Sequence, residues 1–266
     1  MDLLGRRPAI QVCAALASAG LLLAGCTTDS PTVTTSTLTV TKEPPGPSAS
    51  ATPATPGSTE STREFSVGTF TEVRLAAHFA VVITIGSPTS VRAQGDPAAL
   101  DLLDIRTEGD ALIATVKPNV QWPAYAHVTV SVTTPSLTAA RLSGSGQIRI
   151  GSLQTDALSI DQSGAGEIEA PELTVGRLEI SSSGSGKIDA AGTADDADIR
   201  LVGSGETELE TLTVKRAVVS MAGSGSLTIN ATETVRGSTA GSGEIEVTGG
   251  AECSISSVGS GDVTCG

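Results

Sequence analysis

Few residues of this sequence combine the types and the spacing that catalysis needs. The only histidines are His78 and His127, which stand beside residues with a strand pattern, and no Cys–His or Ser–His–Asp order can be built around them. Glutamates alternate with other residues at 206–210 and 244–246, which places each set on the solvent face of a strand. We therefore expect no catalytic residues, no cofactor site and no metal site.

An enzymatic alternative stays open because of these acidic segments. Carboxylates on adjacent rungs of a stacked fold would lie about 5 Å apart, a spacing that allows a weak calcium site and, with it, a polysaccharide lyase. Such a lyase needs a basic group beside the metal, for which Lys215-Arg216 is the candidate. Trp122 and Tyr125 are the exposed aromatic candidates for stacking on a glycan, and covering the end of the core is the other role open to them.

The sequence that precedes Cys26 predicts a membrane anchor. Residues 1–25 combine a basic start at Arg6-Arg7 with an apolar run, as in a signal peptide, and Leu23-Ala24-Gly25-Cys26 resembles the lipobox of bacterial lipoproteins. Cleavage before Cys26 would leave that residue as the lipid-bearing first residue, and two acyl chains suffice for stable attachment. We expect an exported protein that is lipid-anchored to the bacterial cell membrane, with its domain on the extracytoplasmic side.

Charge and composition constrain the partners and the domain boundaries. The chain of 266 residues has 29 acidic and 16 basic side chains, a net charge of −13, which argues against a nucleic-acid partner. Residues 27–62 contain 12 Thr, 6 Ser and 6 Pro, which leaves almost nothing apolar to bury. We expect a disordered tether over 26–63, which begins with the lipidated cysteine, and a folded domain over 64–266.

A glycine phrase repeats seven times from Leu142 onward. Its first glycines recur every 18–20 residues, which is the signature of a solenoid. We expect structural turn glycines, because glycine reaches positive φ at a sharp corner without a Cβ penalty. A phosphate-binding loop is disfavoured because no helix follows, and a calcium-binding nonapeptide repeat because its period is shorter. The paired glycines are Gly144, Gly146, Gly164, Gly166, Gly184, Gly186, Gly203, Gly205, Gly223, Gly225, Gly241, Gly243, Gly259 and Gly261.

Apolar residues alternate on both sides of each glycine phrase. They recur four and six residues after the first glycine, as in Ile148/Ile150, and again six and four residues before it, as in Leu158/Ile160. Strands this close together leave no room for a helix, so the repeat predicts an all-β fold, a parallel β-helix with one rung per repeat. We expect regular rungs over 141–266, and a cap with early rungs over 64–140.

The last two cysteines occupy inward positions of the final repeat. Cys253 aligns with Leu158, and Cys265 aligns with Ile150. Because Cys13 is removed with the signal peptide and Cys26 carries lipid, Cys253 and Cys265 are the pair left in an oxidising compartment. We expect a disulfide that closes a loop of about a dozen residues and ties down the C-terminal rung.

The order of motifs in residues 65–266 resembles a bacterial family called putative auto-transporter adhesin, head GIN domain. The resemblance is carried by Phe79-x-Val81-x-Ile83, by 108–112, and by 128–137 leading into 142–146. It implies a right-handed parallel β-helix, often on a lipoprotein, and it carries over no catalytic residue. We therefore expect a non-catalytic, lipid-anchored envelope protein with an adhesin-like, envelope-binding or structural role, and an envelope glycan or protein as its partner.

Overall fold

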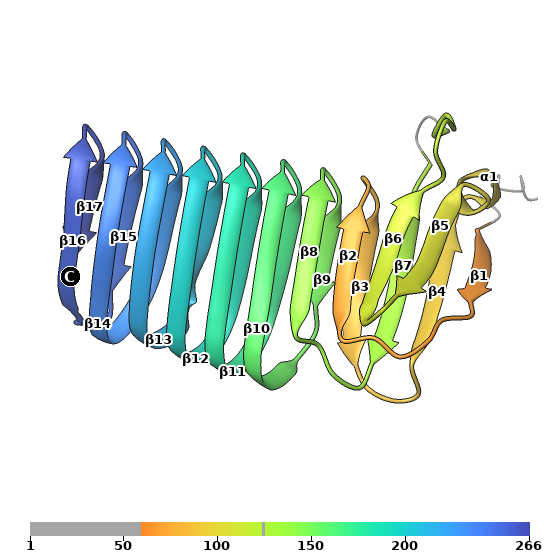
Figure 1. Ribbon diagram of the computed structural model, residues 1–266, viewed down its shortest axis with the longest axis horizontal. Helices are drawn as coiled ribbons and strands as arrows, with labels where there is room; N and C mark the ends of the chain where they lie inside the picture. Colours follow the sequence, from red (N-terminus) through yellow and green to blue (C-terminus); the bar gives the residue numbers. More distant parts are fainter. Residues whose placement is uncertain (1–59, 124–125) are drawn as a thin grey trace, which may run out of the picture. The chain divides into compact units, whose positions relative to one another are not determined.

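The computed structural model describes residues 60–123 and 126–266. They form a 17-stranded sheet and one short helix, and the stacked parallel strands coil into a β-solenoid of about 6 turns (Figure 1). This confirms the predicted all-β parallel β-helix. The predicted signal peptide, Cys26, the tether up to residue 59 and Tyr125 lie outside the described residues.

Each glycine repeat forms one rung, which Figure 1 draws as a ribbon that bends back on itself, in colours from green to blue. Five of these strands are 12 to 18 residues long because they continue around the bend opposite the glycine corner. Equivalent residues of successive rungs pair in parallel, as Ile168 does with Ile188 and Gly164 with Gly184. The strands are β8 (Ala139–Gly144), β9 (Gln147–Ile150), β10 (Leu153–Gly164), β11 (Glu167–Gly184), β12 (Lys187–Gly203), β13 (Glu206–Gly223), β14 (Ser226–Gly241), β15 (Glu244–Thr248), β16 (Glu252–Gly259) and β17 (Asp262–Cys265).

The core consists of columns of stacked inward side chains, because the parallel register puts like positions above one another. Its members are almost entirely aliphatic, and Ile148, Ile168 and Ile188 have no exposed surface. The complete column is Val130, Val81, Ile148, Ile168, Ile188, Thr207, Leu227, Ile245 and Val263. Burial of such columns is the main favourable term in the stability of the solenoid.

The two glycines of each corner serve different steric needs. The first has φ between +119° and +133° in all seven repeats, and a Cβ on Gly164 would lie 2.5 Å from the carbonyl oxygen of Gly144. The second does not need positive φ, but a Cβ on Gly166 would lie 2.7 Å from Cδ2 of Leu142 in the core. Because the corners stack this closely, backbone hydrogen bonds continue around them, as from Ala165 N to Gly144 O at 3.0 Å.

The two rungs before the glycine repeats are not stacked in chain order. The rung of β2 (Glu72–Ala76) and β3 (Ala80–Ile85) pairs on one side with β8 and β9. On its other side it pairs with the later strands β6 (Ala111–Val116) and β7 (Val128–Thr134). The chain therefore places its first rung between two rungs that it makes afterwards.

Antiparallel strands cover the N-terminal end of the stack. β4 (Ser90–Gly95) pairs with β7, and β5 (Leu103–Glu108) pairs with β6, while β1 (Ser61–Phe65) lies along β4. Between β4 and β5, helix α1 (Pro97–Leu100) begins at the N-cap Asp96, whose carboxylate accepts a hydrogen bond from Ala98 N at 2.8 Å. β1 begins three residues before the predicted domain start at 64 because it finds a partner in β4.

Candidate functional site

The most distinctive corner of the solenoid is the one between β2 and β3. Ala80 pairs with Gln147, so Ala77-His78-Phe79 takes the place that Gly144-Ser145-Gly146 has in the next rung. Close packing follows, since a Cβ on Gly144 would lie 2.8 Å from Ala77 O. His78 therefore stands where the glycine repeats carry a serine or an alanine at the tip of the corner.

A groove of about 410 Å³ opens beside this corner. It lies where the cap meets the first glycine corners, and both histidines of the protein line it. This juxtaposition is not evident from the sequence, in which 48 residues separate them. The side chains in its lining that could interact with a ligand include those of His78, Trp122, His127, Thr129, Gln147 and Glu167.

Trp122 forms an aromatic wall of the groove. Its ring stacks on that of Phe79, with 6.2 Å between the centroids, and meets the ring of His78 edge-on at 4.6 Å. Its indole N–H donates a hydrogen bond to Ala126 O at 3.3 Å. Trp122 is partly buried against the core, so it covers part of the core, which is one of the two roles that the sequence left open.

The polar side of the groove comes from outward positions of the rungs. Gln147 Nε2 donates to Glu167 Oε2 at 3.2 Å and to Glu169 Oε1 at 3.1 Å. Among the described residues, no lysine or arginine lines the groove, and Glu167 is the one carboxylate in its lining. The sequence reasoning missed Gln147 as a site residue, and the alignment of Phe79-x-Val81 with Gly146-x-Ile148 was the signal that could have placed it beside His78.

The candidate residues for lyase chemistry form separate ion pairs. Lys215 Nζ lies 2.5 Å from Asp195 Oδ1, and this contact raises the pKa of the lysine. Arg216 contacts Asp196 and Glu233, and its hydrogen bonds lower the pKa of Asp196. Within 60–123 and 126–266, no group of three His, Cys, Asp or Glu side chains could hold a metal ion.

The acidic faces are organised as ladders along the outside of the solenoid. Glu167, Lys187 and Glu206 are register neighbours, but the closest partner of Lys187 is Glu208 on the adjacent rung, at 2.7 Å. Its hydrogen bond with Glu208 raises the pKa of Lys187. Such partly exposed pairs contribute little to stability.

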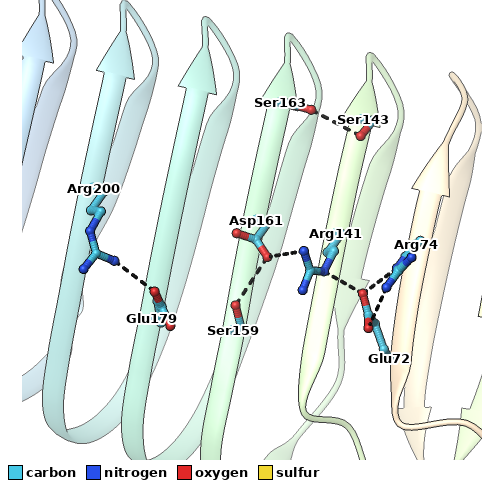
Figure 2. A network of polar contacts seen from close by, with 9 residues as sticks. All are labelled: Glu72, Arg74, Arg141, Ser143, Ser159, Asp161, Ser163, Glu179 and Arg200. Carbon is cyan, nitrogen blue, oxygen red and sulfur yellow. Dashed lines mark hydrogen bonds and ion pairs between the residues drawn. The ribbon is translucent and has the colours of Figure 1, made fainter. Parts of the chain in front are cut away.

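A second network joins the early rungs on the opposite outer face (Figure 2). Glu72 accepts from Arg74 Nε at 2.6 Å and from Arg141 Nε at 2.5 Å, and Arg141 also contacts Asp161 at 3.4 Å. The hydrogen bond from Arg74, followed by the charge of Arg141, lowers the pKa of Glu72. The network crosses β2, β8 and β10 and therefore ties the out-of-order rung to the regular stack.

Cys253 and Cys265 form the predicted disulfide, with 6.3 Å between their Cα atoms. They pair in register with the buried residues Val235 and Val247, so both occupy inward columns. In this last described rung Cys253 is half-buried and Cys265 is exposed. The bond links β16 to β17 across the rung.

Comparison with known proteins identifies the architecture. Residues 69–251 match the family model described as putative auto-transporter adhesin, head GIN domain. The chain belongs to this family. The resemblance seen in the sequence motifs is therefore confirmed, and the groove and the disulfide described above are features of one head GIN domain. No curated protein matches the chain.

Several solved structures share the head GIN architecture. A putative adhesin from Bacteroides fragilis has a TM-score of 0.73 at 25% identity, covering 79% of this chain and 98% of that chain. A putative lipid binding protein from Parabacteroides distasonis has a TM-score of 0.64 at 22% identity, covering 77% and 96%. A putative adhesin from Parabacteroides merdae has a TM-score of 0.62 at 19% identity, covering 77% and 95%; these last two show the fold alone. Among the described residues, no helix is long and apolar enough to span a membrane.

Proposed function

We propose that this protein is a non-catalytic adhesion module that binds a component of the bacterial cell envelope. The observation that carries the proposal is the groove beside His78. It is a preformed hollow on strands whose backbones are fixed by neighbours on both sides, and it offers an aromatic wall and several hydrogen-bonding groups. The adhesin names of related proteins support the same role.

The sequence supports an anchored arrangement of this module. Lipid on Cys26 would hold the protein at the membrane, and residues 26–63 would act as a tether of several nanometres. The net charge of −13 would keep the domain away from anionic head groups. In this arrangement the binding face would lie on the extracytoplasmic side, where envelope glycans and proteins are accessible.

Within the described residues, no ion pair joins the basic residues proposed for lyase chemistry to the alternating glutamates, so the lyase alternative gains no support. Lys215 and Arg216 pair with Asp195 and Asp196, on the bend of the neighbouring rung. The glutamates at 206–210 and 244–246 lie on other segments of their rungs. Charge is thus spread in ladders, which is the arrangement that favours a binding module.

Sedimentation tests the proposal. Purified full-length protein, kept in detergent, is mixed with delipidated envelope fragments so that its lipid cannot cause retention. We expect saturable co-sedimentation with no release of soluble fragments. Absence of retention would contradict binding, and release of oligosaccharides detected by mass spectrometry would contradict the non-catalytic role.

A further inference from the structure

We infer that the groove beside His78 binds an uncharged sugar unit, with Trp122 as the stacking surface. The inference rests on the proposed function, because it names the ligand class of the same site. It follows from three properties of the groove: the cause of the hollow, the chemistry of its walls and its charge.

The hollow results from side-chain size on fixed strands. One outward column runs Thr129, Ala80, Gln147 and Glu167 across successive rungs. Ala80 leaves a gap there because it ends at a methyl group, whereas its neighbours are longer. The adjoining corner residues Ser145 and Ala165 are also small, so the gap continues along the corner ridge. A hollow built in this way exists before the ligand arrives and needs little reorganisation to bind it.

The walls of the groove combine an apolar ring with exposed polar groups. The indole N–H of Trp122 is already hydrogen-bonded to Ala126 O, so the ring offers its apolar surface rather than its donor. Phe79 and His78 contact the ring and hold its orientation. Around it, the exposed side chains of His78, His127 and Thr129 can hydrogen-bond a ligand. An apolar face surrounded by hydroxyl-binding groups matches a pyranose ring, which has apolar C–H faces and a polar rim.

The charge of the groove selects against anions. In the part of the chain that the structure describes, its lining contains Glu167 and no lysine or arginine, and the protein has a net charge of −13. A phosphate, a uronate or another acidic group would therefore enter without a counter-charge and beside a carboxylate, which costs free energy. The volume of about 410 Å³ lies in the usual range of small-molecule sites. An uncharged sugar avoids the electrostatic cost and is small enough for this volume.

The test uses the single tryptophan as a reporter, because Trp122 is the only one in the chain. Purified full-length protein is titrated with three neutral trisaccharides (chitotriose in its N-acetylated form, cellotriose and mannotriose) and with trigalacturonate as the anionic counterpart. We expect at least one neutral trisaccharide to change the tryptophan fluorescence saturably, and trigalacturonate to give no saturable change. No response to any neutral probe, or a response to trigalacturonate alone, would overturn the inference.

Two variants locate the binding in the groove. Ala80→Gln fills the hollow with the side chain that the next rung already carries at Gln147, and Gln147→Ala removes a hydrogen-bonding group from the wall. We expect each to weaken binding about tenfold or more, equivalent to loss of about 1.4 kcal/mol. Ser226→Gln makes the same enlargement in the same column, four rungs from Gln147, and should leave binding unchanged. Equal affinity in Ala80→Gln and the wild type would overturn the groove assignment.

The sedimentation assay separates this inference from the proposed function. Wild-type protein could bind envelope fragments while its tryptophan fluorescence stays unchanged with every neutral trisaccharide. In that case the inference of a sugar site is wrong and the proposed adhesion role stands. If the protein binds neither envelope fragments nor sugars, both proposals fail.

Discussion

Thr207 is the polar exception in an aliphatic column. It is inward-facing and 1% exposed, between Ile188 and Leu227 in the stack, and its hydroxyl has no hydrogen-bond partner among the described residues. A buried hydroxyl without a partner carries a desolvation penalty that folding does not recover. The sequence already placed this residue inward by its spacing from Gly203, but spacing says nothing about hydrogen-bond partners.

Replacing this residue gives the first prediction. Thr207→Val keeps the shape and removes the unpaired hydroxyl, so we expect the free energy of unfolding to rise by about 1 kcal/mol. Thr134→Val is the matched control, because the buried Thr134 hydroxyl lies 2.9 Å from Phe70 O and 3.0 Å from Ser136 O. That variant should lose about 1–2 kcal/mol. Urea denaturation measures both, and a destabilised Thr207→Val would contradict the argument.

The first glycines of the corners support a second prediction. Gly164→Ala forces positive φ on a residue with a Cβ and sets that Cβ 2.5 Å from the carbonyl oxygen of Gly144, so we expect a loss of at least about 2 kcal/mol. Gly109 also has positive φ, at +60°, but a Cβ there would meet nothing within 4 Å. Gly109→Ala should cost only about 1 kcal/mol. Equal losses in thermal or urea unfolding would mean that close corner packing is unimportant.

At the scale of strands, Glu72 couples β2 to β8. Its side chain is only 16% exposed and accepts from two arginines. The folded-state pKa lies below the ordinary value of 4.5, so the carboxylate stabilises the fold above that pH. This contribution disappears as the pH falls through the lowered folded-state pKa, where the carboxylate takes up a proton in the native protein.

The third prediction concerns this pH dependence. Glu72→Gln should lower the free energy of unfolding by about 1 kcal/mol at neutral pH, and the difference from wild type should shrink as the pH drops below 4.5. Glu246→Gln serves as the control, because Glu246 is exposed and makes no ion pair in the described part of the chain. Urea unfolding at a series of pH values measures both variants, and a difference that stays constant down to pH 3 would contradict a role for the Glu72 carboxylate.

The disulfide of the last rung gives the fourth prediction. With 12 residues of sequence separation, its removal in a Cys253→Ser/Cys265→Ser variant should cost about 2–4 kcal/mol. The effect should be local, since β16 and β17 form a terminal rung. Hydrogen exchange should accelerate in β16 and β17 and stay unchanged in β11 and β12. Unchanged exchange throughout would show that the bond adds no rigidity.

The regular rungs were predictable from sequence, whereas the cap was predictable only in part. A fixed period and alternating aliphatic residues suffice for β9 to β17, because the same contacts repeat. The motifs Phe79-x-Val81-x-Ile83 and 128–137, which carried the family resemblance, overlap β3 and β7. β1, β4 and β5 were not foreseen, since an antiparallel cover follows no repeat and its partners are fixed only by tertiary contact.

The candidate site was less accessible to sequence reasoning. His78 and Trp122 were both singled out, but the histidine was interpreted as a spectator and nothing linked it to the tryptophan. Their meeting depends on which rung lies beside which, and that order departs from the order of the chain. Site geometry in this fold therefore depends on the least repetitive part of the sequence.

For the whole molecule, the fifth prediction concerns the anchor. Cys26→Ser should yield an unlipidated precursor that keeps residues 1–25, because no other cysteine of the chain follows a lipobox-like sequence such as Leu23-Ala24-Gly25. Mass spectrometry of the cell fractions measures the N-terminus and the lipid. A processed, membrane-bound variant would contradict the lipobox interpretation, and a Cys13→Ser variant should behave like the wild type.

The out-of-order rung has a consequence for how the protein folds. The rung of β2 and β3 completes its pairing only when β6 and β7 have joined one side of it and β8 and β9 have joined the other. The paired strands of these three rungs lie farther apart in the chain than those of the later rungs, so we expect them to form the slow folding nucleus. Each later rung then joins by closing a loop of about 20 residues, which is entropically cheap. Growth of the solenoid should therefore be fast and directional once this slow nucleus exists.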